Sequence, residues 1–522
     1  MRQVVLVGVC LLMGLAGCKG DPSQPQHWEK RIADGKGKKE KLRAIEELRA
    51  SKFMSAAMLP MLEKRLESEK NYEVKASVAR LLGEQKSPHS LDAMLAAVEF
   101  SGDPDARGLN KEIALALGAL GDPRAVPTLT RLLKTKDNYT TIAAIESLGK
   151  LKAKEAFEPL YEIAKDEKIE PFITRKAIEA LGELGDPRAI PELVKAMYKS
   201  KGFYREASFA LYQVGQSAAD ALLAVVERRD KALFDWGEQN GIQDFAIIIK
   251  AIQVLGDLHE PRAEKAIVGF ASYQNPVEPI RLLMRVQAAD ALGRMRSKAG
   301  VKPIAALLDE PDGETRQKVV WALARIGGKE ALPRLIETAA KGPWDARLES
   351  MRGIAMLGDD PAAFDKFALA EAKLFTAECA DAEGEGECRD VKAAVKSHIS
   401  KIKAFAARAV AAKACRGDPM QWAKHLDDPN EGVRERAAYE VGRGGQPALV
   451  GELMKRLTEK NLDTRVAFIQ GADWLVYDSP EALAEARKSS AELAKQIASE
   501  RGKTDFDRVN EDLKRLLARI SR

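Results

Sequence analysis

The 522-residue sequence lacks the local motifs by which most enzymes are recognised. It contains no HExxH, CxxC or GxSxG, no GxxxxGK[ST] phosphate loop, and no GxGxxG at a strand-to-helix junction. Its five histidines do not stand at metal-ligand spacing from one another. Catalytic groups can still converge from separate parts of a chain. From these absences we predict a protein that is not an enzyme and has no metal, no cofactor and no small-molecule substrate.

Aromatic residues are also scarce, and neither charge is in large excess. Only 6% of the residues are aromatic, and no stretch alternates apolar and polar residues as a half-buried strand does. The 83 basic residues are nearly balanced by 78 acidic ones, so the net charge of +5 is small for this length. The composition therefore predicts an all-α protein and gives no argument for a nucleic-acid partner.

What the sequence does contain is a helix–corner–helix unit, seen most clearly in residues 177–197, AIEALGELGDPRAIPELVKAM. Apolar residues at helical spacing precede and follow the corner. Gly185 suits the left-handed position that ends a helix, while Asp186 can cap the next helix and Pro187 fits its first turn. Gly182, inside the first helix, costs about 1 kcal/mol relative to alanine. We therefore expect close helix packing at Gly182.

Weaker copies of this unit recur along the chain. Equivalent positions are separated by 28 to 37 residues, apart from two steps of 44 and 59 residues. These positions are Gly83, Gly118, Gly149, Gly182, Tyr212, Gly256, Gly293, Ala324, Ala355, Ala414 and Gly442. The corner GDPRA is intact at residues 121–125 and 185–189, and becomes HEPRA at 259–263. A period near 32 residues with two longer steps predicts a solenoid of helix pairs with two insertions.

The two intact corners and their register resemble the HEAT-like repeats first described in phycobilisome-lyase proteins. The resemblance covers roughly residues 40–475 and implies an α-solenoid, a superhelix of stacked antiparallel helix pairs of the HEAT/armadillo type. Members of that family are mostly scaffolds and binding surfaces, and some are bilin lyases. Fold resemblance alone does not choose between these activities.

The N-terminus resembles that of a bacterial lipoprotein. Residues 1–17 have the apolar run of a secretion signal, too short to span a membrane, and Leu15-Ala16-Gly17-Cys18 is similar to a lipobox. The resemblance implies acylation of Cys18 and an anchor in the cell envelope. Lys19 favours the outer membrane, facing the periplasm or the cell surface. We expect residues 18–30 to form a flexible tether.

Beyond the tether we expect a repeat array over residues 31–478, with insertions near 228–245 and 365–412, and polar capping helices over 479–522. The first insertion carries Phe234, Trp236 and Phe245 among acidic residues. It has two interpretations, a contact for a partner or a longer helix whose aromatics pack down.

The second insertion predicts a helical hairpin with cysteines at its tip. Residues 360–378 and 389–414 look helical, and the glycine-rich turn between them places Cys379 opposite Cys388. A disulfide between them would fit an oxidising compartment. Cys415 lies 27 residues further along and remains without an assigned role.

A row of basic residues recurs at the start of the second helix of most repeats. Its members are Lys75, Lys111, Arg175, Arg205, Arg285, Arg316, Arg347 and Arg434. In HEAT-type arrays this helix lines the concave side, so the row is a candidate binding face. The alternative is that each side chain pairs with a nearby carboxylate and links neighbouring repeats.

Together these features predict a membrane-anchored scaffold that binds another envelope protein through its concave surface. The alternatives are an enzyme of bilin-lyase type and a binder of an acidic envelope polysaccharide.

Overall fold

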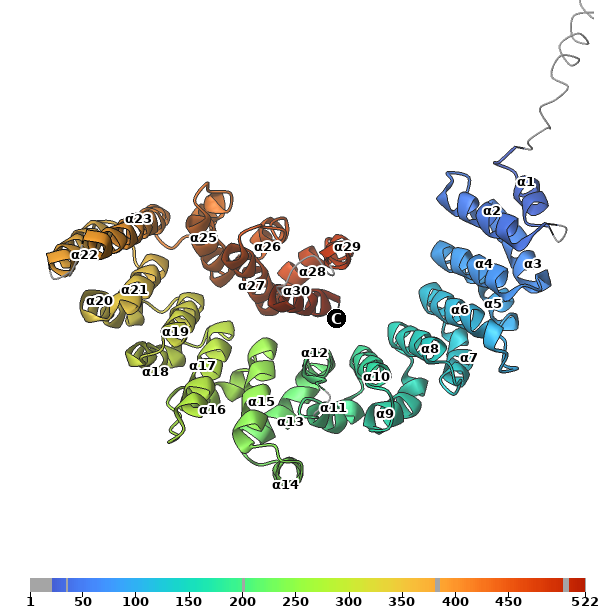
Figure 1. Cartoon of the computed structure of the whole chain (residues 1–522), viewed down its shortest axis with the longest axis horizontal. Helices are drawn as coiled ribbons and strands as arrows, with labels where there is room; N and C mark the ends of the chain where they lie inside the picture. Colours follow the sequence, from blue (N-terminus) through green and yellow to red (C-terminus); the bar gives the residue numbers. More distant parts are fainter. Residues whose placement is uncertain (1–20, 34–35, 200–201, 381–384, 501–506, 522) are drawn as a thin grey trace, which may run out of the picture. The chain divides into compact units, whose positions relative to one another are not determined.

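The computed structural model describes residues 21–33, 36–199, 202–380, 385–500 and 507–521. Throughout these residues the regular structure is helical and no strand occurs, which confirms the all-α prediction. The chain divides into two compact units, residues 1–214 (unit 1) and residues 215–522 (unit 2) (Figure 1). The predicted signal segment and Cys18 lie outside the described residues.

Unit 1 is a stack of helix pairs joined by short 3₁₀ turns. The helices are α1 (Pro25–Arg31), α2 (Lys38–Ala50), α3 (Leu59–Ser68), α4 (Tyr72–Gln85), α5 (Leu91–Ala96), α6 (Arg107–Leu120), α7 (Val126–Leu132), α8 (Asn138–Lys150), α9 (Phe157–Lys165), α10 (Pro171–Leu184), α11 (Ile190–Ala196) and α12 (Tyr204–Val214). The second helices, α4, α6, α8, α10 and α12, pack against one another in sequence and form one layer, which we call the inner layer.

Unit 2 continues the same pattern with more elaborate repeats. Its helices are α13 (Gln216–Val226), α14 (Lys231–Gln239), α15 (Asp244–Leu258), α16 (Glu264–Ala271), α17 (Glu278–Arg294), α18 (Val301–Ala306), α19 (Gly313–Ile326), α20 (Leu332–Lys341), α21 (Trp344–Leu357), α22 (Ala362–Ala380), α23 (Glu385–Cys415), α24 (Pro419–Trp422), α25 (Glu431–Arg443), α26 (Val450–Met454), α27 (Leu462–Asp478), α28 (Pro480–Arg487), α29 (Ser490–Glu500) and α30 (Asp507–Ser521). Among the described residues, no helix has the length and apolar character needed to cross a bilayer.

The repeat corner forms as its residues predict. Gly185 adopts the left-handed conformation, with φ +65°, and ends α10. The Asp186 side chain accepts the backbone N–H of Arg188 at 3.0 Å and so begins the turn that leads into α11. Arg188 pairs back with Asp186 and reaches Glu158 of the preceding repeat at 3.1 Å. The corner therefore also links adjacent repeats.

Gly182, inside α10 just before the corner, is required for close packing of α10 against α12. A Cβ atom on Gly182 would lie 2.6 Å from the Cα atom of Ala210 on α12. Likewise, a Cβ atom on Gly256 of α15 would lie 2.8 Å from the Cβ atom of Ala291 on α17. These approaches let neighbouring second helices pack backbone to backbone, as expected for Gly182.

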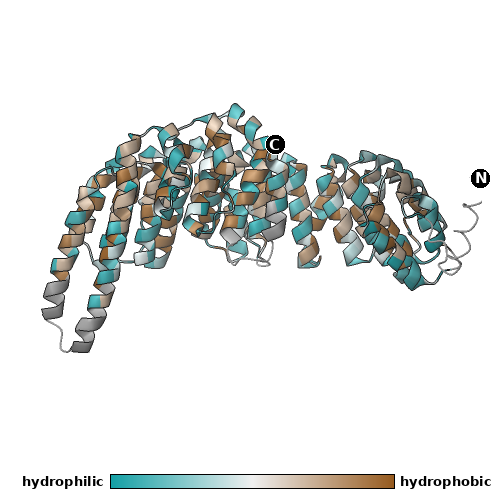
Figure 2. Ribbon diagram, turned by 90° about the horizontal axis from the view of Figure 1, so that it is seen from above, coloured by the Kyte–Doolittle hydropathy of each residue, from teal (hydrophilic) through white to brown (hydrophobic). Residues whose placement is uncertain are grey.

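The second insertion is a long helical hairpin made of α22 and α23, which run side by side in Figure 2. The side chains of Cys379 and Cys388 lie outside the described residues, so their disulfide remains a prediction. Cys415 is a free thiol, buried at the end of α23.

Residues 25–30 of the expected tether are helical. Pro25–Arg31 form α1, and Trp28 is only 4% exposed, with its indole N–H donating to the Pro22 carbonyl at 2.8 Å. The apolar indole gains more from burial than from solvation, so this segment folds onto the array.

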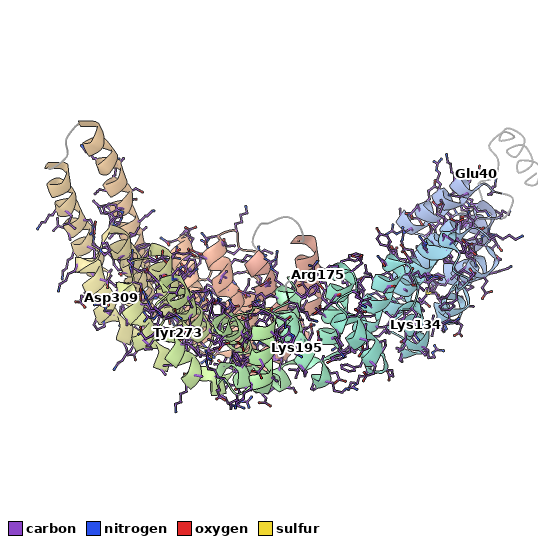
Figure 3. All side chains as sticks on the ribbon, turned by 60° about the horizontal axis from the view of Figure 1, so that its bottom comes forward. Glu40, Lys134, Arg175, Lys195, Tyr273 and Asp309 are labelled. Carbon is purple, nitrogen blue, oxygen red and sulfur yellow. The ribbon has the colours of Figure 1, made fainter. Side chains whose placement is uncertain are left out.

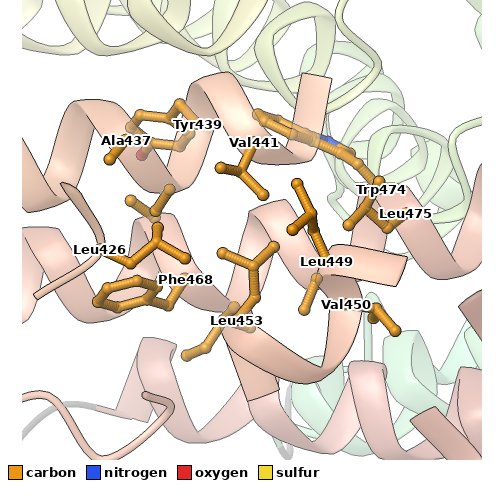
Figure 4. Packing of buried hydrophobic residues seen from close by; sticks show 14 of the residues in the cluster. Leu426, Ala437, Tyr439, Val441, Leu449, Val450, Leu453, Phe468, Trp474 and Leu475 are labelled. Carbon is orange, nitrogen blue, oxygen red and sulfur yellow. The ribbon is translucent and has the colours of Figure 1, made fainter. Parts of the chain in front are cut away.

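The C-terminal helices of unit 2 share one apolar cluster. Figure 4 shows part of it, with Leu449 and Leu453 packed beside Phe468 and Trp474. Val509, Leu513, Leu516 and Ile520 of α30 belong to the same cluster. We call α24–α30 the C-terminal block, because this shared core makes them one body.

Candidate functional site

In unit 2 the predicted basic row is engaged in contacts within the chain. The guanidinium of Arg285 donates to the Tyr273 carbonyl and pairs with Glu310. Arg316 donates to the Glu310 carbonyl, and Arg347 pairs with Glu371 at 2.7 Å. Arg434 likewise bonds the Asp428 carbonyl and Glu459. These contacts tie each second helix to its own turn and to the next repeat.

In unit 1 the same row is more accessible. Arg175 pairs with Glu206 on α12 at 2.9 Å, yet its side chain stays 41% exposed. Lys111 has a 42% exposed side chain, Lys75 is partly exposed and Arg205 is exposed. Figure 3 marks Arg175 on the inner layer and Lys195 on the outer helix α11. A binding role for the row remains a prediction.

Two exposed aromatic side chains lie on α8 and α10 of the inner layer. Tyr139 is 71% exposed at the start of α8, and Phe172 is 42% exposed at the start of α10. They are 33 residues apart, the same step that separates Gly149 from Gly182, so they occupy equivalent positions of adjacent repeats. We did not predict this aromatic pair from the sequence, although its shared register was a signal that could have revealed it.

The first insertion forms an additional helix, α14. Leu233 is buried, and a Cβ atom on Gly237 would lie 2.6 Å from Ile247 Cδ1, so the helix packs tightly on α15. Phe234, Trp236 and Phe245 are all partly buried, and the Arg228 guanidinium lies 5.6 Å from the centroid of the Phe234 ring. Partner contact by these aromatics stays a prediction.

The inner layer of unit 1 also holds a carboxyl with an unusual pKa. Burial and the nearby carboxylate of Glu179 raise the pKa of Glu183 on α10 to about 7. Lys176 lies between Glu146, at 3.0 Å, and Glu179, at 2.8 Å, and so is already shared by two carboxylates. Glu183 consequently retains a large share of its proton at neutral pH.

Replacing Glu183 with glutamine is expected to stabilise unit 1 by about 1–3 kcal/mol at pH 8. The folded state binds the proton more tightly than the unfolded state, so native stability falls as pH rises from about 4.5 through 7. The glutamine variant should lose this part of the pH dependence. Urea unfolding followed by circular dichroism at pH 5 and pH 8 measures it. Equal pH dependence in both proteins would contradict the prediction.

A buried charge cluster joins α15 and α17 to the C-terminal block in unit 2. On α15 and α17, Asp257 pairs with Arg294 at 3.0 Å. From α30, Asp512 reaches Arg294 at 3.2 Å and Arg515 reaches Asp257 at 3.0 Å. Burial works against the charge of Arg294, but the carboxylates of Asp512 and Asp257 hold its pKa well above the usual value. Burial raises the pKa of Asp257, while the charges of Arg515 and Arg294 lower it. The cluster thus sets two guanidinium groups against two buried carboxyl groups.

The same contact includes the helix ends themselves. The Trp474 indole on α27 donates to the Arg294 carbonyl at 2.9 Å, and the Tyr477 hydroxyl donates to the His259 carbonyl at 3.0 Å. Arg519 on α30 donates to the Asp257 carbonyl at 3.1 Å. The last carbonyls of a helix lack intrahelical donors, so these side chains satisfy groups that would otherwise need water.

His259 stands at the centre of this contact as a neutral ring. Burial lowers the pKa of His259 well below its usual value, and the charges of Arg519, Arg296 and Arg294 lower it further. Its Nε2 lies 3.3 Å from Asp473, and its ring meets Tyr477 edge to face. No role for the His259 side chain was predicted from the sequence. In the described part of the chain, no three His, Cys, Asp or Glu residues are placed to hold a metal ion.

Comparison with known proteins identifies the repeats. The model of the HEAT repeats matches residues 59–148, 132–213 and 283–355. The chain is 33% identical over 121 residues to the phycocyanobilin lyase subunit alpha of Nostoc sp., covering 20% of this chain and 43% of that protein. It is 30% identical over 159 residues to the bilin biosynthesis protein PecE of Mastigocladus laminosus, covering 29% of this chain and 56% of that protein.

Two solved structures align with this chain at low sequence identity. The complex of CpcE and CpcF of phycocyanin lyase from Nostoc sp. aligns with 49% of this chain and 95% of that chain, at 22% identity and a TM-score of 0.29. Importin beta aligns with 94% of this chain and 74% of that chain, at 11% identity and a TM-score of 0.48.

These relatives correct one prediction. The sequence led us to predict a protein that is not an enzyme, whereas curated proteins that match it at 30% identity or more are a lyase subunit and a bilin biosynthesis protein. The prediction was wrong because it relied on short motifs, which a repeat protein need not carry. The chain spans about half the length of these two relatives. The HEAT-repeat model matches residues 59–213 and 283–355 of this α-solenoid.

Proposed function

We propose that this chain is a HEAT-repeat subunit that binds a protein partner through the inner layer of unit 1. The observation that carries the proposal is the exposure of Tyr139 and Phe172 at equivalent positions of adjacent repeats. Large aromatic side chains are favoured at the centres of protein interfaces, since each removes a large apolar area from water with little loss of side-chain freedom.

The surroundings of the pair suit a protein surface. Ile142, one turn after Tyr139, is partly exposed, and Arg175, one turn after Phe172, keeps two fifths of its side chain in solvent. Arginine is also enriched at interface centres, because its planar guanidinium both stacks and donates several hydrogen bonds. The surface therefore combines an apolar contact with a half-exposed guanidinium that is already oriented by Glu206.

Changing Tyr139 and Phe172 together to alanine is expected to weaken partner binding about 100-fold, through the loss of two aromatic anchors. Cross-linking of the full chain in intact cells, followed by purification, measures the captured partner. The matched control replaces Met420 and Leu369, which are also exposed, by alanine in unit 2. Undiminished capture by the folded Tyr139/Phe172 variant would rule out this surface.

A second candidate function is that of a bilin lyase subunit, favoured by the identity to the curated lyase subunit and to PecE. In that case unit 1 would hold the partner that exchanges the bilin. Mixing the purified chain with phycocyanobilin and following the visible absorption tests it directly. A saturable spectral shift is expected from a bilin-handling protein, and an unchanged spectrum up to high micromolar protein would argue against this function.

We further propose that Cys18 carries lipid and anchors the chain in the cell envelope, where its partner would reside. Support comes from the lipobox-like run that ends in Cys18. Several acyl chains hold a protein firmly, since each buried CH₂ group contributes about 0.8 kcal/mol. Cys18→Ala should move the protein from the detergent phase to the aqueous phase of a Triton X-114 separation. Equal partitioning of both forms would refute the anchor.

A further inference from the structure

The contact between the C-terminal block and the ends of α15 and α17 differs in kind from the packing between neighbouring repeats. Repeats pack through buried aliphatic side chains, as Ile247, Ile252 and Leu255 of α15 do. The block meets α15 and α17 mainly through ion pairs and through side chains that bond to helix-end carbonyls. Burying charges is costly, so such a contact gains little net free energy even when it is well paired.

The block has an apolar core of its own. Most residues of its cluster come from the block itself, residues 422–520, and none comes from α15 or α17. The remaining members are Ala411, Ala412 and Cys415 of α23, Ala324 of α19 and Met356 of α21. Helix α30 shows the division clearly: Leu513 and Ile520 face the cluster, while Arg515 and Arg519 face α15. The block can therefore leave α15 and α17 without losing its core.

The contact is also imperfectly filled. A cavity of about 20 Å³ remains between Asp257, His259, Arg294 and Gln470, which is room for one water molecule. Among the described residues, both polar atoms of the buried Gln470 amide lack a hydrogen-bond partner. The interior of this contact is therefore polar, unlike the aliphatic packing between neighbouring repeats.

We propose that the ends of α15 and α17 are a docking surface for helices that carry arginines one turn apart, and that the C-terminal block occupies it as a displaceable internal ligand. Asp257 receives Arg515, its carbonyl receives Arg519, and Asp473 of the block holds Arg519 in place at 2.6 Å. A partner helix with arginines four residues apart presents the same two guanidinium groups. This surface belongs to unit 2 and is independent of the aromatic pair in unit 1.

Arg515→Glu together with Arg519→Glu in the full chain tests the proposal. Hydrogen exchange should become about tenfold faster or more in the segments that end α15 and α17, with α8 and α10 unchanged. A synthetic peptide of residues 507–521, added in excess, should restore protection, and the same peptide with both arginines changed to glutamate should not. Full protection in the variant, or no effect of the native peptide, would overturn the proposal.

A charge exchange separates undocking from misfolding. Asp478→Arg alone should speed exchange at the end of α17, and adding Arg296→Asp should restore slow exchange, because this pair between the block and the end of α17 is re-formed with reversed charges. A variant that misfolds would not be rescued by the second substitution. Absence of rescue, with both variants otherwise folded, would show that the ion pair does not hold the block in place.

Discussion

Replacing Arg294 with methionine is expected to destabilise unit 2 by about 3–5 kcal/mol. The substitution removes one of the two guanidinium groups that pair with the buried carboxylates of Asp257 and Asp512. Methionine fills much of the volume but supplies no charge, so the cluster keeps an uncompensated negative charge in a region of low polarity.

Tryptophan fluorescence during urea unfolding measures this effect, since five of the six tryptophans lie in unit 2. Adding Asp512→Asn to the methionine variant should recover more than half of the loss, because the charges balance again. Arg334→Met is the matched control: its pairs with Asp309 and Glu337 are exposed and should contribute about 0–1 kcal/mol. Similar losses for Arg294→Met and Arg334→Met would contradict the role of the buried cluster.

The second large effect is expected at Gly182, where valine should destabilise unit 1 by about 3 kcal/mol. Its side chain would enter the space held by Ala210 on α12, and the two helices would have to separate. The higher helix propensity of valine relative to glycine offsets only about 0.5 kcal/mol of this cost. Hydrogen exchange should rise in α8, α10 and α12, where the second helices pack in sequence.

Gly269→Ala provides the comparison for Gly182→Val. Gly269 lies inside α16, and a Cβ atom there would meet no atom within 4 Å. Alanine at this position should be neutral or stabilise by up to about 1 kcal/mol, because it improves helix propensity without crowding. If valine at 182 were tolerated as well as alanine at 269, close approach would not be the reason for the glycine.

The features of the fold that could be predicted are those set by residues close together in the sequence. Gly185, Asp186 and Pro187 each satisfy a backbone requirement within a few residues, so the corner is visible in the sequence. The hairpin of α22 and α23 was visible for the same reason, since its turn and helices are contiguous. The tether prediction was wrong at Trp28, because a polar, proline-bearing segment gives no sign that one indole is buried against the array.

The buried charge cluster could not be predicted, because its parts are far apart in the chain. Arg294 and Asp512 are separated by 218 residues. Each occurs in a sequence pattern typical of a solvated residue on a polar helix face. The basic row shows the converse problem. Its regular spacing suggested a groove, yet Arg285 and Arg347 bond turns and carboxylates inside unit 2. Spacing reveals a repeated position, and only tertiary contacts reveal what that position binds.

Placing a photo-activatable phenylalanine analogue at position 139 tests the central claim most directly. The matched position is Lys134, which is exposed in unit 1 after the outer helix α7. Irradiation of intact cells should give one dominant adduct from position 139, and that adduct should be absent from position 134 and from a position-139 protein that also carries Phe172→Ala. The same adduct from both positions, or none from position 139 while position 134 reacts, would contradict partner binding by the inner layer of unit 1.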